Sequence, residues 1–175
     1  QKGALDFHVT VKDGTRVTAP VALVCAGAWA GKFSACFGEP VPLVQRGPTM
    51  GVTEPVPYGI LPVVGVKSSN PADDMYFRQV KRGNIVFGGS VRNDPYLDER
   101  RAQPRPGNTL LQLPHLRRIA PALASLHVLR TWSGVESYFP DDLPVMGPSQ
   151  SVSDLYYAFG FCGHGFQTGP GVGDV

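Results

Sequence analysis

The chain has 175 residues, a formal net charge of +2 and no basic run longer than two residues, so it lacks the positive surface that nucleic-acid binding requires. Its longest apolar stretches, such as residues 21–30, are far shorter than the roughly 20 residues that span a bilayer. With 42% hydrophobic residues, 21 glycines and 17 prolines, the sequence predicts a folded, loop-rich α+β protein with a mainly antiparallel sheet.

The first elements form a hairpin and then a strand followed by a helix. Apolar and polar residues alternate from Phe7, turn at Asp13-Gly14 and return over residues 16–19, which predicts the hairpin. The apolar run of residues 21–25 then predicts a strand buried on both faces. A glycine follows, and aromatic residues recur at helical spacing over residues 29–37, so a ligand is expected at the carboxyl end of this strand.

The middle of the chain is rich in turns. The prolines of residues 38–57 predict exposed or edge strands, whereas residues 75–80 and 85–89 predict a second hairpin. Residues 94–108 are polar and predict a surface loop. A helix is expected with Pro114 in its first turn and with its end at Pro121.

The last part predicts a strand near residues 127–135, a turn-rich stretch and a final strand over residues 155–161, which runs into a glycine-rich end. A helix that starts near Gly169 or Pro170 would aim free N–H groups at an anion or a polarised carbonyl. A tight turn without a ligand, with His164 buried as a structural residue, is the alternative interpretation.

The cysteines and histidines do not indicate a metal or disulfide framework. Cys25, Cys36 and Cys162 are odd in number and have no C-x-x-C spacing, so they are expected to be small apolar residues in a reducing compartment. The four histidines lack metal-ligand spacing, and no metal site is predicted.

Several motifs follow one another in order along the chain. They are Ala26-Gly27-Ala28-Trp29, Arg46-Gly47, Trp132-x-Gly134, Pro140-Asp141-x-x-Pro144-x-x-Gly147-Pro148 and Gly160-Phe161-x-Gly163-His164-Gly165. This set resembles the carboxyl-terminal half of the D-amino-acid oxidase (DAO) family of FAD-dependent oxidoreductases. That family includes glycine and sarcosine oxidases and subunits of amino-acid and hydroxyproline dehydrogenases. The resemblance covers essentially the whole chain and is weakest between residues 52 and 108.

The resemblance implies an enzyme with FAD as its cofactor. The candidate FAD-binding residues are Ala26, Gly27, Trp29, Arg46, Gly163, His164, Gly165, Phe166 and Gln167. Helix-start N–H groups after Gly163 would stabilise the negative charge that hydride transfer leaves on the pyrimidine edge of the flavin. Trp29 as a core residue and Arg46 as a surface arginine are the alternatives. The G-x-G-x-x-G fingerprint is absent, so these 175 residues alone are expected to bind FAD weakly or not at all and to be inactive.

The implied reaction is oxidation of the C–N bond of an amino acid or secondary amine by hydride transfer to flavin. Such chemistry needs orientation more than acid–base side chains, so no catalytic residue is singled out. In oxidases of the family an arginine soon after Trp-x-Gly commonly pairs with the substrate carboxylate, but Glu136 stands at about that place. A glutamate repels a carboxylate or attracts an ammonium group, which favours an amino-acid or cyclic-imino-acid dehydrogenase. Arg78 is the candidate carboxylate anchor, and Tyr76 and Tyr138 are candidate pocket residues with core packing as their alternative.

The resemblance also predicts the domain organisation and the partners. Residues 1–40 and 131–175 are expected in the FAD-binding α/β domain and residues 41–130 in an antiparallel-sheet substrate domain. The expected partners are a small amine or amino-acid substrate and further subunits of a dehydrogenase complex. The expected location is the cytoplasm, including the inner face of a membrane. A non-catalytic subunit or partner-binding module that retains the family sheet is the alternative function.

Overall fold

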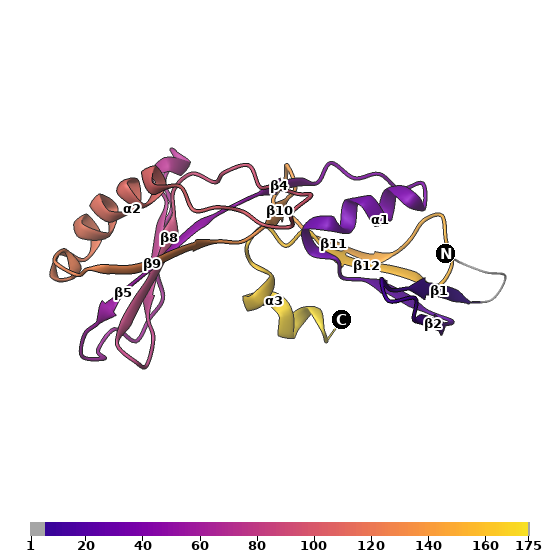
Figure 1. The fold of residues 1–175 in the computed structure, drawn as a ribbon, viewed down its shortest axis with the longest axis horizontal. Helices are drawn as coiled ribbons and strands as arrows, with labels where there is room; N and C mark the ends of the chain where they lie inside the picture. Colours follow the sequence, from indigo (N-terminus) through magenta and orange to yellow (C-terminus); the bar gives the residue numbers. More distant parts are fainter. Residues whose placement is uncertain (1–5, 175) are drawn as a thin grey trace. The chain divides into compact units, whose positions relative to one another are not determined.

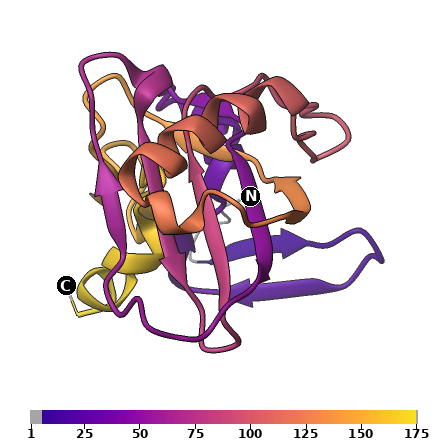
Figure 2. The same cartoon turned by 90° about the vertical axis from the view of Figure 1, so that its left-hand side faces the viewer.

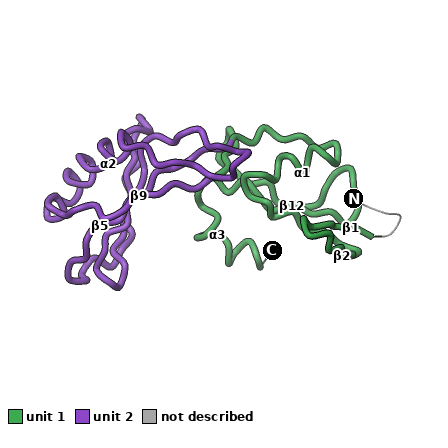
Figure 3. Tube along the Cα trace, viewed as in Figure 1, with its two compact units in different colours: residues 1–44, 136–175 green, residues 45–135 purple. Residues whose placement is uncertain are grey.

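The computed structural model describes residues 6–174, which belong to two compact units. Unit 1 comprises Gln1–Val44 and Glu136–Val175, and unit 2 comprises Gln45–Val135 (Figure 3). Helices combine with mainly antiparallel sheets, so the predicted α+β class is confirmed. Among residues 6–174, every helix falls short of the length and apolarity that a membrane span requires.

Unit 1 is built from two stretches of the chain (Figure 1). The first contains β1 (Phe7–Thr10), β2 (Arg16–Ala19), β3 (Ala22–Val24), the 3-10 helix η1 (Gly27–Trp29) and α1 (Ala30–Cys36). The second contains β10 (Glu136–Tyr138), β11 (Val145–Pro148), β12 (Leu155–Phe159) and α3 (Gly165–Val172). A three-stranded sheet has the order β11-β12-β3, with β12 antiparallel to β11 and parallel to β3.

The first hairpin and the strand after it lie where the sequence predicts them. β1 and β2 pair antiparallel, with Phe7 opposite Ala19. The prediction that the next strand is buried on both faces is wrong, because Val21 is 52% and Leu23 is 60% exposed. Within the described chain β3 has one strand neighbour, β12. Only one face of β3, which carries Ala22 and Val24, packs against the core.

Small side chains on α1, together with Phe37 at its end, pack against the core of unit 1. Ala30 and Ser34 are buried, whereas Phe33 on the predicted helix face is 51% exposed. Side chains of this size let a helix approach its neighbour closely. The core that α1 meets contains Phe7, Ala30, Phe139, Leu155, Tyr157, Phe159 and Cys162.

Glu39 ties the loop after α1 to the sheet of unit 1. Its carboxylate accepts hydrogen bonds from the Tyr157 hydroxyl at 2.6 Å, the Ser149 hydroxyl at 2.7 Å and the Gln150 N–H at 2.6 Å. The bond from Tyr157, followed by that from Ser149, lowers the pKa of Glu39 from 4.5 to about 2. Burial and the same bond raise the pKa of Tyr157 to about 12.

We expect these bonds to make unit 1 sensitive to acid. Because the pKa of Glu39 is lower in the folded state, its contribution is complete above pH 4.5 and disappears as the pH falls through about 2. Glu39→Gln should therefore lower stability at neutral pH and flatten its decline between these values. Denaturant midpoints measured across this range test the prediction. Asp142→Asn, at an exposed acid of the same unit, serves as the control and should keep the wild-type slope.

The chain enters unit 2 within β4 (Val44–Arg46). The other elements of this unit are β5 (Thr49–Pro55), β6 (Val64–Val66), η2 (Pro71–Asp73), β7 (Met75–Gln79), β8 (Asn84–Gly89), α2 (Pro106–Ile119), η3 (Pro121–Leu123) and β9 (Val128–Ser133). A five-stranded sheet has the order β6-β7-β8-β5-β9, and each of its neighbouring pairs is antiparallel. The predicted second hairpin is confirmed as β7 and β8.

Two expectations for unit 2 are corrected. β5 is not an edge strand but lies between β8 and β9, and Pro48 and Pro55 fall just before it and at its last residue. α2 begins at Pro106, so Pro114 lies inside the helix instead of in its first turn. A proline in the first turn loses no helical hydrogen bond, whereas Pro114 leaves the carbonyl of Leu110 without its N–H donor. Leu110 is 68% exposed, which allows water to replace that donor.

α2 covers one face of the sheet of unit 2, as Figure 2 shows. The core between them contains Met75, Phe77, Ile85, Phe87, Leu116 and Leu123.

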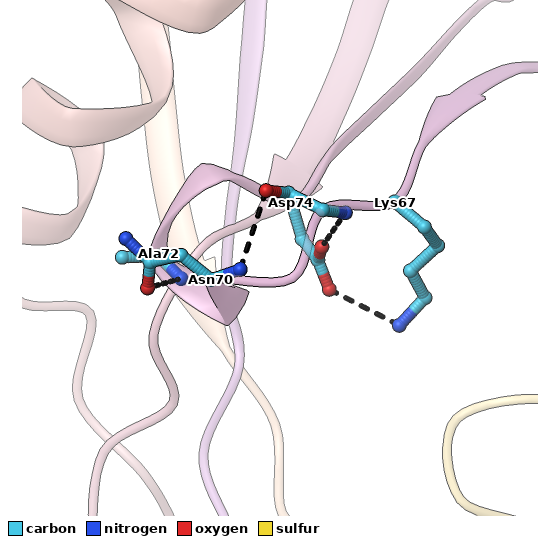
Figure 4. A network of polar contacts seen from close by, with 5 residues as sticks. Lys67, Asn70, Ala72 and Asp74 are labelled. Atoms are coloured by element: carbon cyan, nitrogen blue, oxygen red, sulfur yellow. Dashed lines mark hydrogen bonds and ion pairs between the residues drawn. The ribbon is translucent and has the colours of Figure 1, made fainter.

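The loop that leads into β7 is held by polar contacts (Figure 4). Asp74 accepts from the Ser68 N–H at 2.9 Å and pairs with Lys67 Nζ at 3.1 Å. The Asn70 side chain accepts from the Ala72 N–H at 3.2 Å and caps η2. These bonds fix the start of β7, the strand that carries Tyr76 and Arg78.

Candidate functional site

Two glycine-containing turns follow the carboxyl ends of strands β3 and β12, at the same end of the sheet of unit 1. β3 and β12 are parallel neighbours, with Val24 opposite Tyr157, so their carboxyl ends lie side by side. The first turn, Ala26-Gly27, follows β3, and the second, residues 160–163, follows β12. Ligands of α/β sheets bind at the carboxyl ends of parallel strands.

The first turn leads into η1 and leaves a buried donor without a partner. Gly27 has φ +52°, and a Cβ built on it would meet no atom within 4 Å. The backbone N–H of Trp29 donates to the Ala26 carbonyl at 3.1 Å, which closes the turn. The indole Nε1 of Trp29 is buried but has no hydrogen-bond partner among residues 6–174. A buried N–H without an acceptor costs free energy, so this position favours an external acceptor.

The second turn is packed directly against the end of β10. A Cβ on Gly160 would lie 2.1 Å from Phe139 Cε2, so the ring occupies the space that any other residue would need. The Phe139 N–H donates to Cys162 Sγ at 3.4 Å, and the Cys162 thiol donates to the Gly160 carbonyl at 3.1 Å. These contacts fix the backbone that leads to Gly163.

β10 presents a carboxylate and a phenol to this second turn. Glu136 and Tyr138 are two residues apart on the strand, and the Tyr138 hydroxyl donates a short hydrogen bond to Glu136 Oε2. Gly163 has φ +83°, and a Cβ there would lie 3.4 Å from Glu136 Oε2 and 3.6 Å from the Tyr138 hydroxyl. Because η1 also lies against β10, the structure brings η1, the Glu136–Tyr138 pair and Gly163 together.

The helix after the second turn starts earlier than predicted. α3 begins at Gly165 rather than near Gly169 or Pro170, and Pro170 lies inside it. The interpretation of His164 as buried is wrong, because it is exposed at the position before the helix. Phe166 is also fully exposed, and Gln167 is exposed on the same helix. No residue of α3 is buried against the part of the chain that the structure describes.

The remaining candidate site residues belong to unit 2. Arg46 Nη1 pairs with Asp94 Oδ1 at 2.6 Å, so part of its charge is already balanced within the unit. Tyr76 and Arg78 are both exposed and lie on the same face of β7. The Tyr76 hydroxyl donates to Met50 Sδ at 2.9 Å.

The three cysteines, expected to be small apolar residues, differ in exposure. Cys162 is buried, whereas Cys25 and Cys36 are exposed, and all three are free thiols. No group of three or more histidine, cysteine or acidic side chains suited to a metal ion occurs within residues 6–174.

Sequence reasoning missed three residues that shape these surfaces. Phe139 and Cys162 hold the second turn on β10, and Arg130 on β9 lies opposite Val52. Cys162 is the unspecified position of the last motif and Phe139 directly precedes Pro140, but their mutual contact depends on pairing far along the chain. The alternation of β9 would have placed Arg130 and Trp132 on one face of the strand.

Two glycine turns follow adjacent parallel strands, and one of them leads to a buried indole N–H without a partner among residues 6–174. This arrangement is typical of the end of an α/β sheet at which ligands bind. A model of the FAD dependent oxidoreductase family, DAO, matches residues 2–175. The chain therefore belongs to the DAO family of FAD dependent oxidoreductases, and the resemblance found in the sequence is confirmed. Members of this family act on amino acids and amines.

Known proteins support the same assignment. The chain is 30% identical to mouse (Mus musculus) FAD-dependent oxidoreductase domain-containing protein 1, over 90% of this chain and 34% of that protein. It is 31% identical to hydrogen cyanide synthase subunit HcnC of Pseudomonas protegens, over 82% of this chain and 31% of that protein. Its fold is similar to L-proline dehydrogenase from P. horikoshii, with a TM-score of 0.82 and 29% identity over 95% of this chain and 43% of that one. The chain thus spans less than half the length of these relatives.

The residues at this end of the sheet fit a flavin nucleotide. The Trp29 indole can donate to an acceptor from outside the described chain, and the space beside Gly27 is open to close approach of a ligand. The first N–H groups of α3 have no acceptor within the helix and favour a polarised carbonyl or negative charge.

Proposed function

We propose that this chain is the carboxyl-terminal part of an FAD-dependent oxidoreductase that oxidises the C–N bond of an amino acid or secondary amine. Membership of the DAO family and the two glycine turns at one end of the sheet support this proposal. The observation that carries it is the unpaired indole N–H of Trp29 at this end of the sheet. The limited coverage of the relatives supports the view that other parts of the enzyme lie outside this chain.

Residues from both turns would hold the cofactor. Ala26 and Gly27 would approach it through the backbone, and Trp29 would donate a hydrogen bond from Nε1. Backbone N–H groups of Gly165, Phe166 and Gln167, the first residues of α3, would stabilise negative charge on the ring. When bound, FAD supplies the hydride acceptor for the oxidation. His164, just before the helix, and Arg46, which is paired with Asp94, stay candidates for contacts with other parts of FAD.

The substrate would be oriented by charge. Glu136 carries a carboxylate whose Oε2 accepts from Tyr138, and its other oxygen has a lone pair to offer to the ammonium group of an amine. Tyr138 would line the same pocket, and Tyr76 and Arg78 on β7 stay candidates for substrate contacts. A negative group at position 136 favours amino acids and cyclic imino acids held by both charged ends.

The similarity to a protein named as a subunit, HcnC, supports a second candidate function as a non-catalytic subunit or partner-binding module. The visible spectrum of a full-length protein that contains this chain separates the two. Bound flavin is expected to give the yellow absorbance of an oxidised flavoprotein, and a colourless protein would contradict the proposed enzyme. The 175 residues alone are expected to bind FAD weakly or not at all, because they lack G-x-G-x-x-G.

Trp29→Phe should weaken FAD binding by the full-length protein about fivefold, because it removes one hydrogen-bond donor worth about 1 kcal/mol. Without FAD the same change should cost only the packing of the smaller ring, because the N–H has no partner to lose. Flavin titration and thermal unfolding measure the two effects. Tyr156→Phe, at an exposed ring on β12, is the matched control and should change neither. Equal loss of FAD affinity in both variants would contradict the role of Trp29.

A further inference from the structure

The face of the five-stranded sheet opposite α2 is open in unit 2. On β7, Met75, Phe77 and Gln79 are buried, whereas Tyr76 and Arg78 are exposed. Successive strand residues point to opposite faces of a sheet, so Tyr76 and Arg78 lie on the face that α2 does not cover. The registers of the neighbouring strands show which side chains accompany them.

One row across four strands carries an arginine at each end. Arg78 on β7 lies opposite Val86 on β8, and Val86 lies opposite Val52 on β5. Val52 lies opposite Arg130 on β9, so the row reads Arg78, Val86, Val52, Arg130. Neighbouring strands are about 4.8 Å apart, which places the two arginine Cα atoms about 14 Å apart with the valines between them. Both side chains are long enough to lean over the valines from opposite sides.

The next row across the sheet carries aromatic and thioether side chains beside these arginines. Tyr76 lies opposite Gly88, and Met50 lies opposite Trp132. The Tyr76 hydroxyl and Met50 Sδ meet over Gly88, since a Cβ there would lie 2.5 Å from each. The row of Arg78, Val86, Val52 and Arg130 lies directly beside these side chains on the same face of the sheet.

The two arginines at the ends of this row have no acidic partner among residues 6–174. Within residues 6–174, no ion pair or hydrogen bond is formed by the guanidinium of Arg78 or of Arg130. Glu54, further along β5, is held by His127, which donates from its backbone N–H at 2.9 Å and contacts the same oxygen through Nδ1 at 2.8 Å. The bond from the His127 backbone lowers the pKa of Glu54, and both contacts with His127 are made by the same oxygen, Oε1.

We propose that Arg78 and Arg130 form one carboxylate-binding site above Val86 and Val52, with one guanidinium from each end of the row. Planar guanidinium groups bind a carboxylate through paired hydrogen bonds, which suits an anion held between them. The inference rests on the proposed function, because the anion is the carboxylate of an amino-acid substrate. The sequence predicted Arg78 alone as the carboxylate anchor, and Arg130 is the second residue of the proposed site.

The test uses a full-length, flavin-loaded protein that contains this chain, with propionate and its neutral isostere propionamide as probes. Ligand-observed NMR should detect binding of propionate and not of propionamide. Arg78→Gln and Arg130→Gln should each raise the propionate Kd about tenfold, and the Lys variants should recover part of the loss. Arg118→Gln, which removes the same charge from exposed α2 on the covered face, is the control and should stay within about twofold.

Equal binding of both probes, or an equal effect of the Arg118 control, would overturn the site. Failure of this inference differs from failure of the proposed function. A protein with flavin absorbance but no propionate effect in the Arg78 and Arg130 variants would reject only the arginine site. A colourless protein would reject the oxidoreductase, whatever it does with propionate.

Discussion

Gly160→Ala should lower the free energy of unfolding by about 3 kcal/mol, because two costs add at one position. Gly160 has φ +76°, a conformation that costs other residues about 1–2 kcal/mol. The new methyl group would also lie 2.1 Å from Phe139 Cε2, and overpacking of a core costs about 1–3 kcal/mol. Displacement of Phe139 would move the end of β10, so flavin retention and substrate binding by the full-length protein should fall together with stability.

Gly14→Ala separates these two costs. Gly14 has φ +88° in the β1–β2 turn, and a Cβ there would meet nothing within 4 Å. It should therefore show only the backbone cost of about 1–2 kcal/mol in denaturant unfolding. Phe139→Leu should partly rescue Gly160→Ala, because a smaller side chain leaves room for the methyl group. If Gly160→Ala is no more harmful than Gly14→Ala, the contact with Phe139 does not hold the turn.

Features set by neighbouring residues could be predicted from the sequence. The Asp13-Gly14 turn, the hairpin of β7 and β8 and the final strand before the glycine-rich end all lie where the local patterns place them. The family resemblance depended on motifs of the same local kind. Turn chemistry and alternation act over a few residues, so a single chain contains enough information for them.

Features that depend on distant pairing could not be predicted. The apolar run of residues 21–25 is typical of a buried strand, but Val21 and Leu23 are exposed. Their burial depends on segments distant in the sequence, which local patterns do not reveal. Likewise, β5 is central because β8 and β9, encoded far downstream, pair with its two edges. The contact of Glu136 and Tyr138 with Gly163 and the row that joins Arg78 to Arg130 have the same origin. The sequence identifies such residues individually, whereas their proximity in space depends on the pairing registers of the strands that carry them.

Glu136→Gln should reduce kcat/KM for an amine substrate about 10- to 100-fold, mainly through a higher KM. A hydrogen bond to a charged group is worth about 1.5–3 kcal/mol, which corresponds to this range. The variant keeps the size of the side chain and an acceptor for the Tyr138 hydroxyl, but it removes the negative charge that would hold an ammonium group. Steady-state assays of the full-length protein across D-amino acids, sarcosine, proline and hydroxyproline, with dye and oxygen as acceptors, provide the measurement.

Two comparisons distinguish charge recognition at Glu136 from a structural role. Tyr138→Phe removes the hydroxyl that orients the carboxylate but keeps its charge, so its loss should stay below about fivefold. Inhibition by methylammonium should weaken in Glu136→Gln while inhibition by propionate stays unchanged, and the Arg78 and Arg130 variants should show the reverse pattern. If Glu136→Gln weakens both inhibitors equally, or releases flavin, the residue supports the turn at Gly163 rather than the substrate. If only inhibition by methylammonium weakens in Glu136→Gln, the charge of this carboxylate recognises the ammonium group.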